Sequence, residues 1–256
     1  MHCVYESVQS VINNSSTRIK AGLGSAPSLA IIVPILNEID RLPLLLKELA
    51  SINPEKTILV DGGSTDGTLE WLEKYFSDQP SNQIFIQSSA GRAQQMNAGA
   101  EAAGQDVLLF LHADTVLPEL AKQDIEKSVS AGFTWGRFNV SFDEECRVMS
   151  VIAFFINVRS RISAIATGDQ AMFISREMFL SVNGFDDIAL MEDVAMSKKL
   201  RKFSKPYASK SRVVTSARRW KQNGVVRTII KMWWYRLAYF FGASPDSLAQ
   251  GYRNVR

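Results

Sequence analysis

The amino-acid sequence predicts an α/β fold with a mostly parallel central sheet and helices on both of its faces. From residue 29 onward, short apolar runs alternate with amphipathic segments of helix length. This alternation is typical of repeated βαβ units, whose strands are buried on both faces. Length and composition agree, because 256 residues with 46% hydrophobic and 21% charged side chains can form one sizeable core.

The first half of the chain contains the clearest elements. Strands are expected where apolar residues run together, and helices where apolar residues recur at helical spacing between those runs. The expected strands are 29–35, 57–62, 83–88 and 107–114, and the expected helices are 40–52, 68–76 and 91–104.

Beyond residue 130 the alternation is less regular. We expect there an alternating strand, an apolar helix or pair of helices, a strand followed by a helix that ends at Gly184, and a further helix. These segments are 133–142, 146–166, 170–185 and 191–203. The chain is therefore expected to form a loose tail over 1–28 and a single domain over 29–256, with parts at 29–116, 117–224 and 225–256.

Charge and cysteine content argue against several classes of protein. The net charge of +3 is small, and without a recognisable motif it gives no support for nucleic-acid binding. Cys3 and Cys146 are too few for a disulfide framework or a cysteine metal cluster, so a reducing, cytoplasmic setting is expected. Segment 1–28 contains no apolar run long enough for a signal peptide.

Two apolar stretches, 148–158 and 225–241, are shorter than the roughly 20 apolar residues of a membrane-spanning helix. The second stretch combines Trp233, Trp234 and Phe240 with basic residues, a composition suited to the surface of a membrane. A helix packed on the core explains the same pattern, so both interpretations stand.

Polar residues follow each of the four strands expected in the first half. The carboxyl ends of parallel strands share one edge of a sheet, and ligands bind at that edge. We therefore expect one site that gathers Pro34, Asn37 and Glu38, the run from Asp61 to Asp66, Gly91 and Arg92, and His112 and Asp114.

The segment VDGGSTDGT (60–68) is the sharpest local signal. Its glycines allow a tight turn, and Ser64, Thr65 and Asp66 are suited to cap the following helix. No cap requires a carboxylate at Asp61, which can accept hydrogen bonds from a nucleobase or a ribose hydroxyl. The glycine spacing matches neither a P-loop nor a dinucleotide-binding fingerprint.

The segment from His112 to Asp114 ends the fourth expected strand with two polar side chains that point the same way. Asp114 is suited to hold a divalent cation together with the phosphate oxygens of a ligand. A semi-buried histidine and an aspartate that caps a turn are the alternative interpretation.

Carboxylates are the main candidates for proton transfer. The sequence has two histidines, His2 and His112, which excludes a two-histidine metal site in the domain, and no well-placed serine or cysteine accompanies His112. Glu192 and Asp193 form an adjacent pair at the start of an expected helix. The favourable position of acidic residues at a helix N-terminus explains this pair equally well.

The segment SARRWKQNG (216–224) places Arg218 and Arg219 beside Trp220. Such a cluster can hold a phosphate group and stack on a ring. A solvated basic face is the alternative.

Seven motifs carry a family resemblance when they are taken in order. They are IIVPILNE, VDGGSTDGT, GRAQQMNAGA, LHADT, GDQAMFISREMF, NGF with MEDVAMSKKL, and RRW. Over residues 29 to 220 this ordered set resembles the family 2 glycosyltransferases of the GT-A fold. GRAQQMNAGA, HADT and the C-terminal GASPDSLAQGYRNVR are further similar to a bacterial branch described as arsenosugar-biosynthesis-associated glycosyltransferases.

The resemblance implies a Rossmann-like, nucleotide-binding half over 29–116 and an acceptor and catalytic half over 117–224. It implies a nucleoside-diphosphate sugar as donor, usually of UDP, and Mn²⁺ or Mg²⁺ as cofactor. By the same resemblance Asp193, with Glu192 beside it, is the catalytic base, and Asp114 is the metal ligand. Nucleotide contacts are then expected from Pro34, Asn37, Glu38, Asp61, Arg92 and His112, and contacts with the sugar, diphosphate or acceptor from Asp169, Gln170, Arg219 and Trp220.

Two positions depart from the family pattern. His112 replaces the first aspartate of the metal-binding DxD motif, which leaves one fewer anionic ligand, and Ser216 replaces the Gln of Q-x-x-R-W. The expected reaction is inverting transfer of a hexosyl group to a hydroxyl of a lipid or a small metabolite. A nucleotide-sugar-binding module without turnover is favoured by His112 and opposed by the retained Glu192–Asp193 pair. A nucleotidyltransferase would need a Gly-rich phosphate loop near the first strand, which VPILNEIDRL does not offer.

Overall fold

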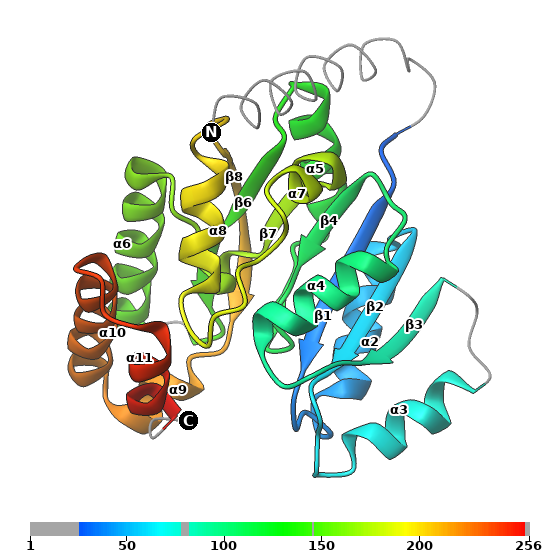
Figure 1. Cartoon of the computed structure of the whole chain (residues 1–256), viewed down its shortest axis with the longest axis horizontal. Coiled ribbons are helices and arrows are strands. Elements are labelled where there is room, and N and C mark those ends of the chain that lie inside the picture. Colours follow the sequence, from blue (N-terminus) through cyan, green and yellow to red (C-terminus); the bar gives the residue numbers. More distant parts are fainter. Residues whose placement is uncertain (1–25, 78–81, 145, 254–256) are drawn as a thin grey trace.

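The computed structural model describes residues 26–77, 82–144 and 146–253. In these residues one eight-stranded sheet has the strand order β3-β2-β1-β4-β7-β6-β8-β5 (Figure 1). The strands are β1 (Leu29–Ile35), β2 (Lys56–Asp61), β3 (Gln83–Gln87), β4 (Val107–Phe110), β5 (Thr115–Val116), β6 (Trp135–Phe142), β7 (Met172–Ser175) and β8 (Tyr207–Thr215).

Helices cover both faces of this sheet. They are α2 (Leu42–Ile52), α3 (Thr68–Phe76), α4 (Arg92–Ala102), α5 (Ala121–Ser130), α6 (Arg147–Ser163), α7 (Arg176–Ser181), α8 (Glu192–Leu200), α9 (Arg218–Asn223), α10 (Val225–Phe240) and α11 (Pro245–Arg253). A short 3-10 helix, η1 (Gly168–Gln170), comes directly before β7.

The sheet changes character between the two halves of the chain. Strands β1 to β4 pair in parallel, whereas β7 runs antiparallel to β4, with Met172 opposite Phe110. The start of β7, and η1 with it, therefore lies beside the carboxyl end of β4. This pairing brings residues about 60 positions apart in the sequence to one edge of the sheet.

Alternation along the strands divides the core into two layers. Ile31, Val33 and Ile35 of β1 pack in the layer that includes α2, α5 and α6, whereas Ala30 and Ile32 pack in the layer that includes α4, α7 and α8. Successive side chains of a strand point to opposite faces, so a strand buried on both sides reads as a continuous apolar run. This is why the first-half strands are visible in the sequence.

The predicted α/β fold is confirmed, with helices on both faces of a sheet that is parallel through its first half. The apolar segment 146–166 forms one helix, α6, rather than two. The strands β5 and β8 and the helices α5, α9 and α11 were not predicted. In the described part of the chain, no helix has the length and apolar character needed to cross a membrane.

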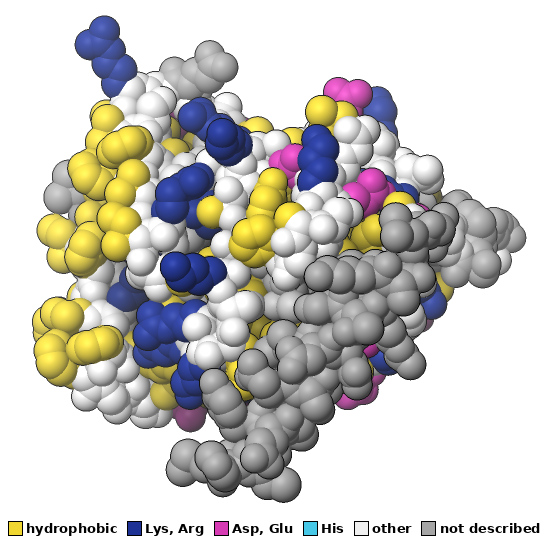
Figure 2. Space-filling model, turned by 90° about the horizontal axis from the view of Figure 1, so that it is seen from above, with side chains coloured by type: hydrophobic (Ala, Val, Ile, Leu, Met, Phe, Trp, Pro, Cys, Tyr) yellow, Lys and Arg dark blue, Asp and Glu magenta, His cyan; other side chains and the backbone are white. Residues whose placement is uncertain are grey.

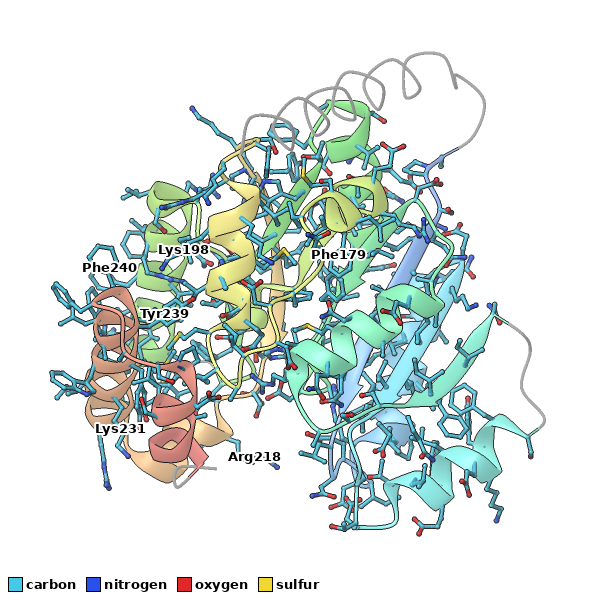
Figure 3. The ribbon with its side chains drawn as sticks, viewed as in Figure 1. Phe179, Lys198, Arg218, Lys231, Tyr239 and Phe240 are labelled. Carbon is cyan, nitrogen blue, oxygen red and sulfur yellow. The ribbon has the colours of Figure 1, made fainter. Side chains whose placement is uncertain are left out.

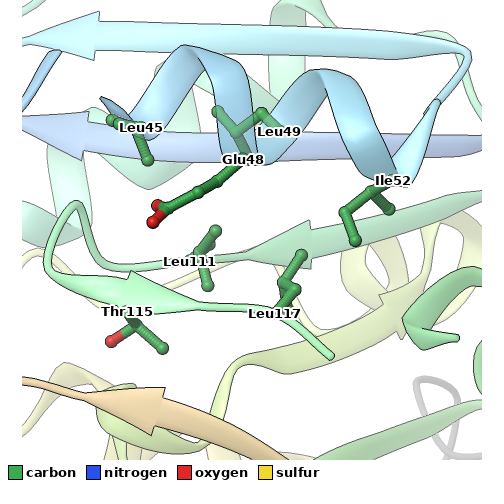
Figure 4. Close-up of a pocket in the computed structure, with 7 residues that line it drawn as sticks. All are labelled: Leu45, Glu48, Leu49, Ile52, Leu111, Thr115 and Leu117. Carbon is green, nitrogen blue, oxygen red and sulfur yellow. The ribbon is translucent and has the colours of Figure 1, made fainter. Parts of the chain in front are cut away.

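A small pocket lies between α2 and the segment 111–117 (Figure 4). It is lined mainly by Leu45, Leu49, Leu111 and Leu117, with Glu48 beside them, and it leaves no room for a water molecule. This pocket is therefore a packing gap under α2, and the candidate site lies elsewhere.

Candidate active site

The loops that follow β1 and β2 are joined side by side at the carboxyl edge of the sheet. The backbone N–H of Asn37 donates to Oγ of Ser64 at 2.9 Å, and Oδ1 of Asn37 accepts from the N–H of Thr65 at 2.8 Å. The backbone N–H of Glu38 donates to Oγ1 of Thr68 at 3.0 Å. Asn37 has φ of +56°, a left-handed conformation that asparagine adopts more readily than most residues other than glycine. These hydrogen bonds hold the loop in one shape.

Asp61 has a local role that the sequence did not indicate. Its side chain is only 1% exposed. Oδ2 accepts from the N–H groups of Gly63 at 2.9 Å and Ser64 at 3.1 Å, and Oδ1 accepts from the hydroxyl of Ser64. The expectation that no local structure needs this carboxylate is therefore wrong. Contact with a nucleobase stays a prediction, and it requires the turn to give up part of this network.

Asp66 connects the two loops and the start of α3. Its carboxylate accepts from the N–H of Thr68 at 3.0 Å and from the N–H of Ile39 at 3.2 Å. Burial opposes ionisation of this carboxyl, but the hydrogen bonds from Thr68 and Ile39 outweigh it, so the pKa of Asp66 lies below its usual value. The expected helix-capping function is consistent with this geometry.

Gln95 of α4 is a buried residue that the sequence analysis missed. Its Nε2 donates to the carbonyl oxygens of Ile35 and Val60, both at 2.8 Å, and so joins the ends of β1 and β2. A β-carbon at Gly62 would lie 2.8 Å from the side-chain amide carbon of Gln95, so glycine is needed there. The sequence could have indicated this residue, because Gln95 lies between the apolar residues Ala93 and Met96, which face the core.

The segment after β4 reaches the same edge. Nε of Arg41 donates to the carbonyl oxygen of Ala113 at 3.2 Å, which connects the loop after β1 to this segment. His112 is half-buried, whereas Asp114 is exposed to solvent. A β-carbon on Gly168 would lie 2.3 Å from Nε2 of His112, so the imidazole packs directly against the backbone of η1. The structure therefore brings His112 and η1 together.

Asp193, the second residue of α8, completes this arrangement. Its Oδ2 accepts from the N–H of Gly168 at 2.8 Å, and its Oδ1 accepts from the N–H of Val194 at 2.6 Å. Gly168 thus lies between the imidazole of His112 and the carboxylate of Asp193. Burial raises the pKa of Asp193; the hydrogen bond from Gly168 opposes this effect, and the negative charge of Asp169 adds to it.

Two residues beside this carboxylate have left-handed backbone conformations. Met191, which precedes α8, has φ of +70°, and Ala171, which follows η1, has φ of +46°. Residues other than glycine in this region cost on the order of 1–3 kcal/mol and gather at functional sites. Met191 and Ala171 thus flank the hydrogen-bonded pair Asp193 and Gly168 in the sequence.

Arg159 of α6 supplies positive charge near these carboxyls, and the sequence analysis did not include it. Burial and the nearby Arg236 lower the pKa of Arg159 to about 10, while the charges of Asp193 and Asp169 oppose that shift. Among the described residues, its buried Nε and Nη2 have no hydrogen-bond partner. A buried guanidinium with free donors beside two carboxyls favours binding of an anionic or polar group.

Gln170 and Trp220 do not line an open site. Gln170 is fully buried; its Nε2 donates to the carbonyl oxygen of Phe138 at 3.3 Å, and its Oε1 accepts from the N–H of Thr167 at 3.3 Å. Trp220 is 4% exposed and packs edge-on against Phe142, with ring centroids 5.7 Å apart. The structure gives these two side chains structural roles, in contrast to the contacts expected from the sequence.

The other candidates occupy helix starts or exposed ends. Arg92 begins α4 and is half-buried, and Glu192 begins α8 and is buried. Pro34 lies in β1 near its carboxyl end. Arg219 lies in α9, and its side chain is outside the described part of the structure.

The side chains at this edge of the sheet could hold a divalent cation only if a bound ligand supplied further oxygen atoms. Within the described residues, no group of three or more His, Cys, Asp and Glu side chains is arranged to hold a metal ion. Asp114 offers one exposed carboxylate in a turn after β4, which ends at Phe110 and not, as predicted, at residue 114. Mg²⁺ is commonly bound by one or two carboxylates together with substrate phosphates, so a diphosphate would have to complete its coordination.

Comparison with known proteins identifies the family. The sequence pattern described as "Glycosyl transferase family 2" matches residues 30–175, which is more than half of the chain. The chain belongs to this family. Membership agrees with the family that the resemblance implied, and the narrower likeness to the arsenosugar-associated branch stays a prediction.

Sequence relatives of this family member match it only in part. A PGL/p-HBAD biosynthesis glycosyltransferase of Mycobacterium bovis is 36% identical over 99 residues, which are 37% of this chain and 38% of that protein. A poly-β-1,6-N-acetyl-D-glucosamine synthase of Staphylococcus epidermidis is 23% identical over 204 residues, 74% of this chain and 50% of that protein. The chain thus spans half or less of the length of these relatives.

Solved structures support the GT-A fold of this family member. The mannosyltransferase PcManGT from Pyrobaculum calidifontis, in complex with GDP-Man and Mn²⁺, aligns with a TM-score of 0.58 and 18% identity over 99% of this chain and 79% of that chain. A crystal structure of Staphylococcus aureus TarS 1-349 aligns with a TM-score of 0.54 and 17% identity over 75% of this chain and 61% of that chain. At these identities the likeness shows the fold alone.

Proposed function

We propose that the protein transfers a sugar from a nucleoside-diphosphate sugar to a hydroxyl group with inversion at the anomeric carbon. The observation that carries this proposal is the hydrogen bond of 2.8 Å from Gly168 to Asp193. It holds a carboxylate of raised pKa against Gly168, whose backbone packs on His112 in the segment that follows β4. A base of raised pKa and a metal-binding position are thus brought to one edge of the sheet.

The donor is assigned to the first half of the chain, residues 29–116. The joined loops after β1 and β2, with Asn37, Glu38 and Asp61, form the wall where the nucleotide is proposed to lie, and UDP is the expected nucleotide. Arg92 at the start of α4 and Arg219 of α9 are proposed to contact the diphosphate. The mannosyltransferase of the same fold, solved with GDP-Man, supports a nucleotide sugar as donor.

Asp114 is the proposed metal ligand, and the neighbour that holds Mn²⁺ supports the use of a divalent cation. When bound, Mn²⁺ or Mg²⁺ would stabilise negative charge on the departing diphosphate. The imidazole of His112, unlike an aspartate, offers no anionic ligand to a metal ion. It packs against Gly168, so its proposed function is to position η1 beside the donor.

The reaction needs a single displacement. Asp193 accepts the proton of the acceptor hydroxyl while the oxygen attacks the anomeric carbon from the face opposite the diphosphate. The bond between that carbon and the diphosphate oxygen breaks, and the oxygen leaves with the electron pair. Glu192 is buried beside this base, and its proposed role is to support it. A lipid or a small metabolite supplies the hydroxyl, and a cytoplasmic location remains part of the proposal.

A module that binds a nucleotide sugar without turnover is the second candidate. The single exposed carboxylate at the DxD position favours it. The raised pKa of Asp193 opposes it, because a carboxyl that only stabilised a helix N-terminus would not need to be buried beside Asp169.

The first test is a thermal-shift matrix of UDP, GDP, CDP, ADP and TDP, each with and without Mn²⁺ or Mg²⁺. Wild type is compared with Asp114→Ala and with Glu101→Ala, which removes an exposed carboxylate from α4. A ligand at 100 times its Kd stabilises the folded protein by about 2.7 kcal/mol. We expect one diphosphate to raise the melting temperature in the presence of metal, and we expect only Asp114→Ala to lose this shift. If no nucleotide raises the melting temperature of a folded sample, the donor assignment is wrong.

A further inference from the structure

We propose that the outer faces of α6 and α10 dock on the surface of an anionic lipid bilayer. Exposed apolar side chains gather on both helices and directly after the end of α10. Six of them are aromatic: Phe154, Phe155, Trp233, Trp234, Phe240 and Phe241. Their exposed fractions lie between 61% and 77%. We call this surface the α6–α10 face. Isolated exposed apolar residues are common, but a gathered set of this size marks an interaction surface.

Each helix has apolar residues on two sides. In α6, Met149, Ile152 and Ile156 pack in the core. In α10, Ile229 and Met232 are partly buried against the same core, whereas Trp233 and Trp234 are exposed. The core-facing residues explain why each helix packs on the domain. The outward apolar residues have no such explanation.

The two helices lie side by side at one end of the molecule (Figure 1). Arg159 of α6 and Arg236 of α10 are close enough for their charges to interact, which agrees with that placement. Phe240 points away from the domain, whereas the residue before it, Tyr239, points toward α8, where Nζ of Lys198 lies 4.5 Å from its ring centroid (Figure 3). The α6–α10 face is thus directed outward, and in Figure 2 its hydrophobic side chains form two neighbouring groups on one edge of the molecule.

The charge of this face favours an anionic lipid surface as its binding partner. Neither α6 nor α10 contains an aspartate or a glutamate. Of their six basic residues, Arg159 and Arg236 lie on the inner side near Asp193, whereas Arg147, Arg161 and Arg227 are exposed and Lys231 is half-buried. In Figure 2, hydrophobic side chains gather along the edge of the molecule where these helices lie, and Lys and Arg side chains are next to them. Aromatic residues beside basic ones, without carboxylates, suit the interface of a membrane that contains anionic lipid. A second copy of this positively charged face would repel the first.

Docking in this way would place the candidate base near the membrane. Burial raises the pKa of Asp193, and the positive charge of Arg236 opposes that shift. Burial also raises the pKa of Tyr239, and the negative charges of Asp186 and Asp193 add to that shift. Arg236 and Tyr239, both on α10, therefore lie close to the carboxylate of Asp193. If the proposed function is correct, a hydroxyl carried by a lipid can reach Asp193 from the bilayer. This consequence for the acceptor rests on the proposed function, whereas the docking itself does not.

Flotation with lipid vesicles tests the docking. The full chain is mixed with vesicles of phosphatidylcholine alone or of phosphatidylcholine with 30% phosphatidylglycerol, at low and at high salt. We expect binding to the anionic vesicles only and a loss of binding at high salt, because salt screens surface charge. Trp233→Ser/Trp234→Ser and Arg227→Gln/Lys231→Gln are each expected to lower binding at least tenfold. Leu44→Ser/Leu180→Ser, which changes two residues of similar exposure on α2 and α7, is the matched control and should bind like wild type.

Three results would overturn the proposal. They are no binding to anionic vesicles, unchanged binding by the Trp233→Ser/Trp234→Ser variant, and a concentration-dependent dimer in light scattering that the same variant abolishes. The last would assign the face to a second copy of the chain. The nucleotide-dependent thermal shift of each variant is recorded in parallel, since a retained shift with lost flotation separates the docking from the donor site.

Discussion

The backbone N–H of Gly168 donates to Oδ2 of Asp193 at 2.8 Å, and this hydrogen bond joins η1 to the first turn of α8. The carboxylate is buried beside Asp169, which raises its pKa, but it accepts a hydrogen bond that favours the ionised form. A base needs this combination: it must be ionised before reaction and must hold a proton afterwards.

Replacing the base should stop turnover without removing the donor. Asp193→Asn keeps the size of the side chain and an acceptor for Gly168, but it cannot take a proton. We expect donor turnover, measured as release of nucleoside diphosphate from the sugar nucleotide, to fall by about 10²- to 10⁴-fold. Nucleotide affinity, measured by calorimetry, should change by less than about threefold. Asp187→Asn, an exposed carboxylate in the loop before α8, is the control and should turn over like wild type.

Equal losses of turnover and nucleotide affinity in Asp193→Asn would contradict this assignment. Such a result would give Asp193 a structural role at the start of α8, as the alternative interpretation of the Glu192–Asp193 pair had it.

The pH dependence of turnover follows from the raised pKa of Asp193. Because only the ionised carboxylate can accept the proton, turnover should fall as the pH drops through that raised pKa, above the usual range of aspartate. Arg159→Met removes a positive charge that interacts with Asp193, so the acidic limb of the profile should move to higher pH. Arg161→Met, which removes an exposed arginine from the same helix, should leave the limb in place. A limb that Arg159→Met does not move would show that Arg159 acts only through packing.

The same shift predicts a pH-dependent stability. A carboxyl whose pKa is raised by folding keeps its proton more tightly in the folded state, so its contribution favours folding at low pH and is lost as the pH rises through the folded pKa. Each unit of difference between the folded and unfolded pKa corresponds to about 1.4 kcal/mol. Asp193→Asn should therefore gain free energy of unfolding relative to wild type between pH 4 and pH 8, measured by urea denaturation. A difference that stays constant with pH would mean that folding leaves this pKa unchanged.

The parts of the fold that the sequence predicted are those with local signals. Segment 68–76 was expected as a helix and is α3 with the same bounds, because its apolar spacing and the turn before it are local. The strands of the first half are continuous apolar runs for the reason that both of their faces are buried. Strand β8 alternates exposed and buried residues and includes Lys210 and Arg212, so its sequence reads as a polar segment.

The sequence predicted several residues of the candidate site but not the contacts between them. The motif order indicated His112, Asp169 and Asp193, whereas the packing of His112 on Gly168 depends on the antiparallel pairing of β7 with β4, which no local pattern contains. Gln170 and Trp220 were expected at a ligand because polar and aromatic side chains serve that purpose. Burial by Phe138 and Phe142, which come from a distant part of the chain, gives both residues structural roles instead.

The close contact between His112 and Gly168 predicts an interaction between two substitutions. A β-carbon on Gly168 would lie 2.3 Å from Nε2 of His112, so Gly168→Ala must displace the imidazole. Overpacking of this kind costs about 1–3 kcal/mol of unfolding free energy. The double variant Gly168→Ala/His112→Ala should recover most of that loss, measured by thermal and urea denaturation. Gly104→Ala, where nothing lies within 4 Å of the added carbon, is the control. Additive losses in the double variant would show that the imidazole is not the obstacle.

Gln95 should stabilise the carboxyl edge of the sheet more than its neighbour in the helix does. Gln95→Leu removes two buried hydrogen bonds of 2.8 Å to the carbonyl oxygens of Ile35 and Val60, which lie at or next to the ends of β1 and β2. A buried carbonyl left without a donor costs about 1–3 kcal/mol, so the unfolding free energy should fall by that amount. Gln94→Leu loses only an exposed contact with Asp187 and should change stability by less than about 0.5 kcal/mol. Because the loops that follow β1 and β2 form the proposed nucleotide wall, Gln95→Leu should also weaken the nucleotide-dependent thermal shift. A destabilised variant with an unchanged nucleotide affinity would separate the stability of this edge from its role in binding the donor.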